Sequence, residues 1–239
     1  MEENESEAGT VKNIYQLIVH EQIKSPISEA YRVLRTNLNF CKTSGQLRTI
    51  MFTSAGPGEG KSLTAANLAI TLAQTGKKVL IADCDLRKPV QYKIFKQGRS
   101  GGITNILASD SDKIAFVNET DIPNLFFLSS GPIPPNPSEL LGSEKMLELL
   151  KRLKIKFDFI VLDAPPVIAV TDACVLASKV DGIVLVLNVE KVRPEMAQKA
   201  KELLQRARGQ LLGVVLNKVE IESEYHNYYY YYDKKIVAR

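Results

Sequence analysis

One short segment, Ala55-Gly-Pro-Gly-Glu-Gly-Lys-Ser62, restricts the fold of this chain more than any other. It follows an apolar run at residues 49–54 and precedes a helical pattern that begins near Thr64. A strand, a glycine-rich turn and a helix in this order are typical of a P-loop, whose glycines let backbone N–H groups turn inward around a phosphate. Ala55 stands where the usual pattern has glycine, which is a mild change. The segment therefore predicts a phosphate-binding loop at the carboxyl end of a strand.

Apolar runs alternate with helical patterns along the chain, as in parallel strands joined by crossover helices. The expected strands are residues 49–54, 79–82, 126–129, 159–162, 183–187 and 212–216, and the expected helices are 25–41 with a capped start, 64–74, 143–153 and 194–207. This order predicts an α/β fold, a doubly wound and mostly parallel sheet flanked by helices. In such a P-loop NTPase fold, ligands bind at the carboxyl ends of the strands.

The chain is 239 residues long, which suits one large α/β domain better than two small ones. We expect that domain at residues 26–220. We expect residues 1–25 to form a flexible N-terminal segment, since they are polar and mixed in charge, and residues 221–239 to form a flexible tyrosine-rich tail.

The P-loop predicts ATP as ligand and Mg²⁺ as its companion ion. Lys61 is expected to reach the β- and γ-phosphates, and the Ser62 hydroxyl is expected to ligate magnesium. Asn217, at the end of the last strand, either reads the adenine ring or satisfies a turn. A glycine-rich turn without a ligand is the alternative explanation of the loop. The expected ATP-binding residues are Gly56, Pro57, Gly58, Glu59, Gly60, Lys61, Ser62, Leu63 and Asn217.

Two other strands end in carboxylates. Asp83 and Asp85 share one side of their strand because strand side chains alternate, so a cation between them would relieve their repulsion; alternatively they cap a turn. Asp163 ends the buried run at 159–162 and is expected to bind magnesium through water. The expected metal ligands are Ser62, Asp83, Asp85 and Asp163, and the expected catalytic residues are Lys61, Asp83 and Asp85. Arg87, which follows these acids, either contacts phosphate or lies on the surface.

Composition narrows the function classes. The formal net charge is only +4 with no long basic run, so no nucleic-acid partner is expected. Cys41, Cys84 and Cys174 have no CxxC spacing, which indicates free thiols rather than a zinc site. We expect a cytoplasmic protein, because the start is acidic and no apolar stretch is long enough to span a bilayer.

Together these motifs resemble the bacterial tyrosine kinases of capsule and exopolysaccharide production, from about Ser25 to the C-terminus. The P-loop, the Asp83 and Asp85 segment and the strand ending at Asp163 correspond to the family's Walker A, Walker A prime and Walker B motifs. The segment Glu29-Ala-Tyr-Arg32-Val-Leu-Arg35 matches the family's E-x-x-R-x-x-R oligomerisation motif. The alternative for Glu29, Arg32 and Arg35 is a solvated helix face with internal ion pairs.

Six of the nine tyrosines crowd the C-terminal end: Tyr225, Tyr228, Tyr229, Tyr230, Tyr231 and Tyr232. In the family such a cluster is the autophosphorylation site. The resemblance implies that one subunit's tail enters a neighbour's active site within a ring-shaped homo-oligomer. An accessible terminal segment presents a hydroxyl to the γ-phosphate at little cost. The alternative is an adhesive aromatic tail.

The resemblance also implies partners. They are the cytosolic end of a transmembrane activator, which would recruit the chain to the inner face of the cell membrane, a cognate tyrosine phosphatase, and protein substrates of sugar-nucleotide metabolism. The implied role is regulation of capsular or exopolysaccharide synthesis.

Two other functions share the Walker motifs. A partition or division-site ATPase switch has them, but it typically carries a further lysine near the loop start, where this chain has Ala55, Gly56 and Pro57. An idle scaffold would bind ATP without turnover. Labelling of the tail tyrosines by ATP separates these functions from a kinase.

Overall fold

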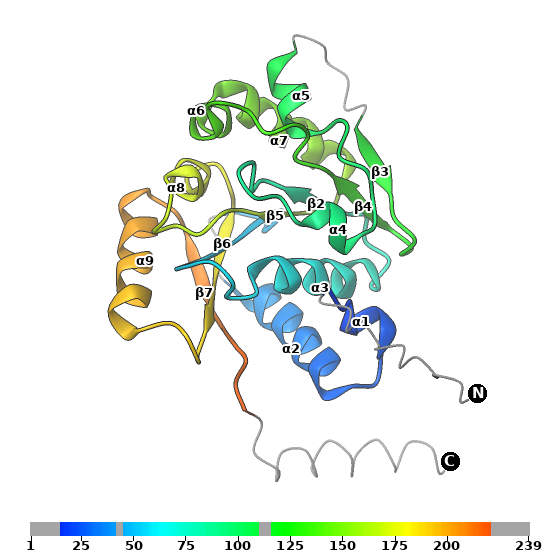
Figure 1. Ribbon diagram of the computed structural model, residues 1–239. Coiled ribbons are helices and arrows are strands. Elements are labelled where there is room, and N and C mark those ends of the chain that lie inside the picture. The colour runs from blue at the N-terminus through cyan, green and yellow to red at the C-terminus, as the bar shows by residue number, and fades with distance from the viewer. Residues whose placement is uncertain (1–14, 42–44, 110–115, 221–239) are drawn as a thin grey trace, which may run out of the picture.

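The strands form one sheet in the order β3-β4-β2-β5-β1-β6-β7 (Figure 1). The computed structural model describes residues 15–41, 45–109 and 116–220. The strands are β1 (Thr49–Ser54), β2 (Val79–Asp83), β3 (Val117–Glu119), β4 (Leu125–Leu128), β5 (Phe159–Asp163), β6 (Gly182–Asn188) and β7 (Leu211–Asn217). All neighbours pair in parallel except β3 and β4, which are antiparallel. The predicted doubly wound, mostly parallel sheet is confirmed.

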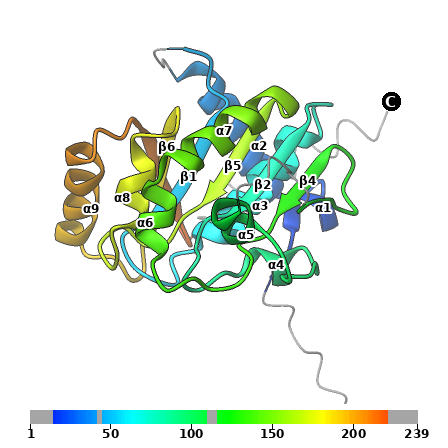
Figure 2. The same ribbon diagram turned by 90° about the horizontal axis from the view of Figure 1, so that it is seen from above.

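Helices cover both faces of the sheet (Figure 2). The helices are α1 (Ile18–Glu21), α2 (Pro26–Phe40), α3 (Lys61–Ala73), α4 (Gln91–Ile94), α5 (Ile103–Ala108), α6 (Pro137–Gly142), α7 (Glu144–Lys156), α8 (Asp172–Ala177) and α9 (Pro194–Arg206). Core residues of α1 to α4 form one apolar cluster, and those of α5 to α9 form another. The sheet therefore lies between two hydrophobic layers.

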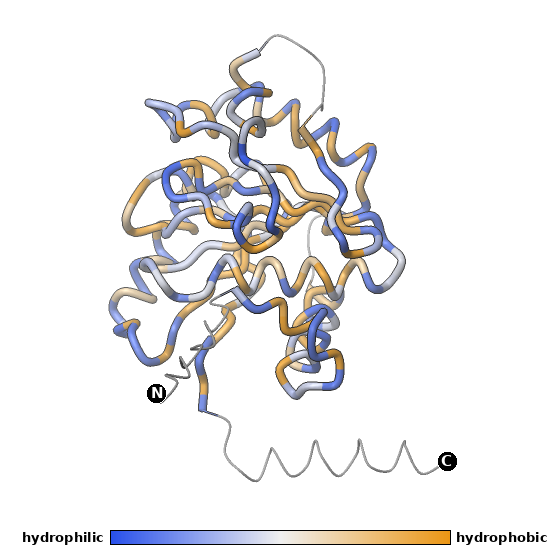
Figure 3. Tube along the Cα trace, turned by 45° about the vertical axis from the view of Figure 1, so that its right-hand side comes forward, coloured by the Kyte–Doolittle hydropathy of each residue, from blue (hydrophilic) through white to orange (hydrophobic). Residues whose placement is uncertain are grey.

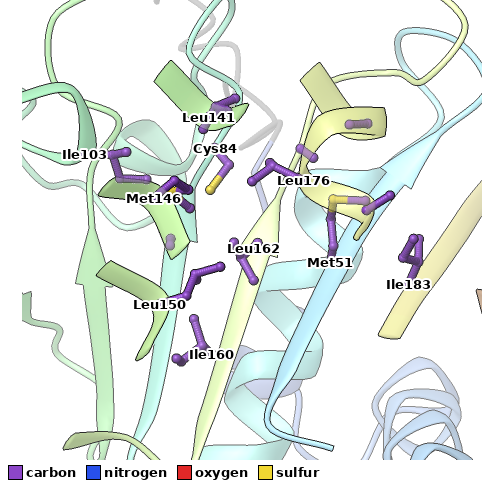
Figure 4. Packing of buried hydrophobic residues seen from close by; sticks show 14 of the residues in the cluster. Met51, Cys84, Ile103, Leu141, Met146, Leu150, Ile160, Leu162, Leu176 and Ile183 are labelled. Atoms are coloured by element: carbon purple, nitrogen blue, oxygen red, sulfur yellow. The ribbon is translucent and has the colours of Figure 1, made fainter. Parts of the chain in front are cut away.

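The central strands supply both layers because their side chains alternate between the two faces. In β5, Ile160 and Leu162 join the cluster on the α7 side, shown in Figure 4, while Val161 joins the cluster on the α3 side. Each large apolar side chain buried in this way contributes about 1.5–3 kcal/mol. Figure 3 shows the resulting distribution, with apolar segments gathered in the interior of the fold.

Local signals explain the main helix boundaries. The Ser25 hydroxyl accepts a hydrogen bond from the Ser28 N–H at 3.1 Å, and Pro26 occupies the first turn, so α2 begins where the sequence predicts. The four long predicted helices are found as α2, α3, α7 and α9. The short elements α1, α4, α5, α6, α8 and β3 were not predicted, since three to six residues carry too little periodicity.

The N-terminal boundary of the folded part needs a correction. Residues 17–25 were expected in a flexible segment, but they contain α1, and Val19 is completely buried. The Val19 N–H donates to the Asn67 side chain of α3 at 3.1 Å, and the Ser28 hydroxyl donates to the Gln22 carbonyl at 2.7 Å. One buried apolar residue and these polar contacts fix the segment to α3 and α2. Residues 1–14 lie outside the described residues.

The described part of the chain contains no helix with the length and apolar character needed to cross a membrane.

Asp181, in the turn before β6, links three elements at the amino end of the sheet. Its carboxylate accepts the N–H groups of Arg48 at 3.0 Å and Thr49 at 2.8 Å, and it lies 2.8 Å from the Lys154 ammonium. Burial alone would raise the pKa of Asp181, but hydrogen bonds from Lys154, Thr49 and Arg48 outweigh it and lower the pKa.

We predict that Asp181→Asn lowers the free energy of unfolding by about 1–2 kcal/mol at pH 7. Because the folded-state pKa is depressed, the stabilisation is present above the ordinary value of about 3.9 and is lost as pH falls through the folded-state pKa. Urea unfolding at pH 7 and near pH 3 measures this. Lys154→Met is the control, since it keeps both backbone contacts and should cost about 0–1 kcal/mol. A difference that is the same at both pH values would contradict the prediction.

Candidate active site

The P-loop connects β1 to α3 and has the backbone conformation that its glycines allow. Gly58 and Gly60 have φ of 75° and 92°, which residues with a side chain rarely adopt. The Ser54 hydroxyl donates to the Gly56 carbonyl at 2.7 Å, and the Glu59 carboxylate accepts the Gly56 N–H at 2.6 Å. The N-terminus of α3 follows directly, so its free N–H groups and partial positive charge favour an anion here.

Asn217, at the end of β7, holds the P-loop through a side-chain hydrogen bond. Its side-chain nitrogen donates to the Glu59 carbonyl at 2.9 Å, and its oxygen accepts the Lys218 N–H at 3.0 Å. A Cβ on Gly60 would lie 2.0 Å from the Asn217 nitrogen, so glycine here leaves room for this contact. Asn217 thus supports the loop in this structure, and contact with adenine stays a prediction.

Lys61 places a buried ammonium between the carboxylate at the end of β5 and one just beyond β2. Its nitrogen lies 3.0 Å from Asp163 Oδ1, 3.2 Å from Asp85 Oδ2 and 3.1 Å from the Ser62 hydroxyl. Burial alone would lower the pKa of Lys61, but the charges of Asp163, Asp85 and Asp83 raise it, so the ammonium is charged. In this arrangement the cation between Asp85 and Asp163 is Lys61. A cation between Asp83 and Asp85 stays a prediction.

Asp83 is fully buried and its carboxylate turns toward the backbone of the next segment. Its Oδ2 accepts the N–H groups of Val90 at 3.1 Å and Gln91 at 3.0 Å. Burial raises the pKa of Asp83 to about 8, with the charge of Asp163 adding to the effect and the Gln91 N–H opposing it. Asp83 pairs in register with Asp163 of β5, which is why two carboxylates from distant segments interact.

The residues of this site fit a magnesium ion held together with phosphate oxygens. Ser62 and Asp163 offer the oxygen donors that Mg²⁺ prefers, and Mg²⁺ is usually bound by one or two protein oxygens plus substrate phosphates and water. In the described ranges, His, Cys, Asp and Glu form no group of three arranged to hold a metal by themselves. The structure thus brings together Lys61, Ser62, Asp85 and Asp163, while Asp83 lies deeper.

Arg87 is exposed, but its guanidinium is paired. Its guanidinium donates two hydrogen bonds of 2.9 Å to the buried Asp172 at the start of α8, and Ser138 of α6 also donates to Asp172. The hydrogen bond to Asp172 raises the pKa of Arg87. This pair joins the segment after Asp85 to the two helices beside it.

The three residues of the expected oligomerisation motif differ in their contacts. Arg32 lies 2.7 Å from Glu29 on the same helix and donates to the Ile23 carbonyl, and both side chains remain partly exposed. Arg35 donates to the Thr71 carbonyl of α3 at 2.7 Å. Arg35 therefore joins two helices of one subunit, whereas Glu29 and Arg32 have an exposed side. The six tail tyrosines lie outside the described residues.

The sequence reasoning missed Gln91, which contacts Asp163, Asp83 and Ser62. No motif marks this glutamine, eight residues beyond Asp83. Its proximity to an acid at the start of a short helix was the only signal, and that signal is weak.

The comparisons with known proteins agree with this geometry. Residues 47–209 match the model of an AAA-domain family. The chain is 42% identical to a putative tyrosine-protein kinase, CapB, of Staphylococcus aureus over 92% of its length and 96% of that protein, and 43% identical to the tyrosine-protein kinase YwqD of Bacillus subtilis over 92% of each. The crystal structure of the chimerical protein CapA2B2 superimposes with a TM-score of 0.82 and 43% identity, covering 86% of this chain and 90% of that one.

The contact between Gly60 and Asn217 generates a prediction about nucleotide binding. Gly60→Ala should weaken nucleotide affinity at least about tenfold, because the new Cβ meets the Asn217 amide, so either this amide leaves the Glu59 carbonyl or the loop shifts. Titration with a fluorescent nucleotide measures this. Gly76→Ala is the matched control, since Gly76 also has a positive φ of 80° but no neighbour within 4 Å. Equal affinities of the two variants would contradict the prediction.

Proposed function

The chain belongs to the bacterial tyrosine kinases and is a protein-tyrosine kinase, and on that premise we propose that it transfers the γ-phosphoryl group of ATP to its own C-terminal tyrosines. The acceptors would be Tyr225, Tyr228, Tyr229, Tyr230, Tyr231 and Tyr232. The observation that carries the proposal is the position of Lys61 at the end of the P-loop, within 3.0–3.2 Å of Asp163 and Asp85. A phosphate-binding lysine and carboxylates for a metal and a proton are the parts that phosphoryl transfer needs.

Each residue of the site has a role in this proposal. Lys61 and the loop N–H groups hold the phosphates of ATP. Ser62 and Asp163 are the proposed protein ligands of magnesium, and Asp85 and Asp83 complete the acidic surroundings. Magnesium, when bound, offsets negative charge on the phosphates.

Asp83 or Asp85 accepts the proton of the attacking hydroxyl. A tyrosine with its ordinary pKa of about 10 is protonated at neutral pH, so a nearby base assists the transfer. Asp85 keeps slight exposure, and its Oδ1 accepts the Lys88 N–H at 2.9 Å. Asp83 is closed off from solvent, and burial raises its pKa to about 8, so its carboxyl is mostly protonated at neutral pH. The slight exposure of Asp85 therefore favours Asp85 as the base.

We further propose that transfer occurs between subunits of a ring, with residues 26–220 as kinase domain and residues 221–239 as a flexible acceptor tail. Support comes from α2, where Glu29 and Arg32 are partly exposed beside the exposed apolar residues Ile27 and Val33. In a ring these groups would exchange their contacts within one helix for contacts with the neighbouring subunit.

The proposed cellular role is regulation of capsular or exopolysaccharide synthesis. The proposed partners are the cytosolic end of a transmembrane activator, a tyrosine phosphatase and proteins of sugar-nucleotide metabolism. The proposed location is the cytoplasmic face of the membrane, reached through the activator. These proposals rest on the family resemblance.

A mixing experiment tests transfer between subunits. Lys61→Met has an intact tail but should transfer no phosphate, whereas a variant with phenylalanine at all six tail positions keeps the site but has no acceptor. We predict that each protein alone, given labelled ATP and magnesium, gains less than about 1% of the wild-type label, in line with losses of 10²-fold or more when a transition-state contact is removed. The mixture should label the Lys61→Met subunits, which a size tag identifies.

Circular dichroism must first establish that Lys61→Met folds, because the substitution leaves Asp163 and Asp85 without their cation. Asp163→Asn is a second inactive subunit with a smaller change in charge. Label that persists on isolated Lys61→Met would contradict the kinase proposal. An unlabelled mixture of two folded proteins, with a fully labelled wild type, would contradict transfer between subunits.

A further inference from the structure

Gln91 is a buried polar residue at the centre of the site, and none of the motifs includes it. It is the first residue of α4, and none of its surface is exposed. A glutamine side chain rarely occupies a fully buried position unless its amide is hydrogen-bonded. Its contacts therefore indicate what it does.

One amide group of Gln91 connects two residues that belong to different elements. Its Nε2 donates to Asp163 Oδ2 at 2.8 Å and to the Ser62 carbonyl at 2.9 Å. The Gln91 backbone N–H also donates to Asp83 Oδ2 at 3.0 Å. The start of α3 and the ends of β5 and β2 thus meet at a single residue.

The two oxygens of Asp163 consequently have different donors. Oδ1 faces the Lys61 ammonium at 3.0 Å, and Oδ2 faces the Gln91 amide at 2.8 Å. Donors on both oxygens fix the rotation of the carboxylate about its last bond. In the proposed function Lys61 also holds phosphate oxygens, so its contact with Asp163 is shared with the nucleotide. The hydrogen bond from Gln91 to Asp163 does not involve phosphate, so it stays in place when nucleotide binds.

The orientation of the Gln91 amide follows from chemistry. In the opposite orientation the Gln91 Oε1 would face Asp163 Oδ2 and the Ser62 carbonyl oxygen. All three atoms are acceptors, so no hydrogen bond could form. With Nε2 in that position, Oε1 is buried and has no hydrogen-bond partner among the described residues. An unpaired buried acceptor costs free energy, so the amide is arranged for the site rather than for fold stability alone.

We propose that Gln91 is a positioning residue for magnesium, which holds the Asp163 carboxylate and the first turn of α3 at Ser62 in the arrangement that binds the ion with the nucleotide. The inference rests on the proposed function, in which Ser62 and Asp163 are the magnesium ligands. Residues that orient metal ligands typically change metal affinity by 10–100-fold when they are replaced.

The test compares nucleotide affinity with magnesium and with a chelator. Gln91→Met keeps the length of the side chain and removes the amide, and Gln91→Glu replaces the donor by an oxygen that repels Asp163. For wild type, magnesium should strengthen binding of a fluorescent adenine nucleotide. For Gln91→Met this gain should shrink by about tenfold or more, and for Gln91→Glu further, while the affinity in chelator changes by less than about twofold.

Gln97→Met is the matched control, because Gln97 lies six residues further along and donates to the Glu119 carbonyl at 3.0 Å, away from the site. It should keep the wild-type gain. Thermal unfolding of each variant separates a loss of fold from a loss of metal response, and Gln91→Glu carries the test if Gln91→Met is unfolded.

A folded Gln91 variant with the wild-type magnesium gain would overturn the role of Gln91 and leave the proposed function intact. A wild type whose nucleotide affinity ignores magnesium would overturn the magnesium ligands themselves, and Gln91 with them. A loss of affinity that is equal with and without magnesium would show a structural role and would also overturn the proposal.

Discussion

A buried ammonium surrounded by carboxylates organises this protein. Lys61 and Asp163 are almost without solvent, and each charge alone would be costly in the interior. They are tolerated because they lie 3.0 Å apart and because further donors complete the carboxylate. This arrangement requires that β1, which leads into the P-loop, lies directly beside β5, and the strand order β2-β5-β1 provides this. The apolar layers on both faces of the sheet keep these strands in place. The packing of the core therefore fixes the distance between Lys61 and Asp163.

The P-loop itself depends on segments far from it in sequence. Asn217 contacts the Glu59 carbonyl from the last described strand, 158 residues away. Gln91 contacts the Ser62 carbonyl from the segment after β2. The loop is therefore held on two sides, and its glycines permit both its left-handed backbone and the close approach of Asn217. A loop held in advance binds phosphate with less loss of conformational entropy than a mobile one.

The α2 helix has two sides with different tasks. Leu38 and Arg35 face the body of the protein, and the Arg35 contact with the Thr71 carbonyl adds to the packing on α3. Glu29 and Arg32 keep exposed surface, together with apolar neighbours. The motif that identified the family is thus divided in this subunit between internal support and a surface suited to assembly. An internal ion pair was the alternative explanation of this motif, and the pair between Glu29 and Arg32 is present. The proposal of assembly therefore rests on the exposure of these residues and on the family resemblance.

By itself the sequence determined the fold class, six of the seven described strands, the four long helices and the kinase family. These properties follow from local patterns, namely apolar periodicity, the Ser25 cap and the glycines of the P-loop, each of which acts within a few residues. The tertiary structure decided which groups meet. Lys61 lies between Asp85 and Asp163, Asp83 turns to the backbone, Arg87 pairs with Asp172, and Gln91 joins the site without any motif. The reason is physical. The contacts of a side chain at the end of a parallel strand depend on every neighbour that the sheet brings to that edge, and those neighbours come from segments more than 100 residues apart.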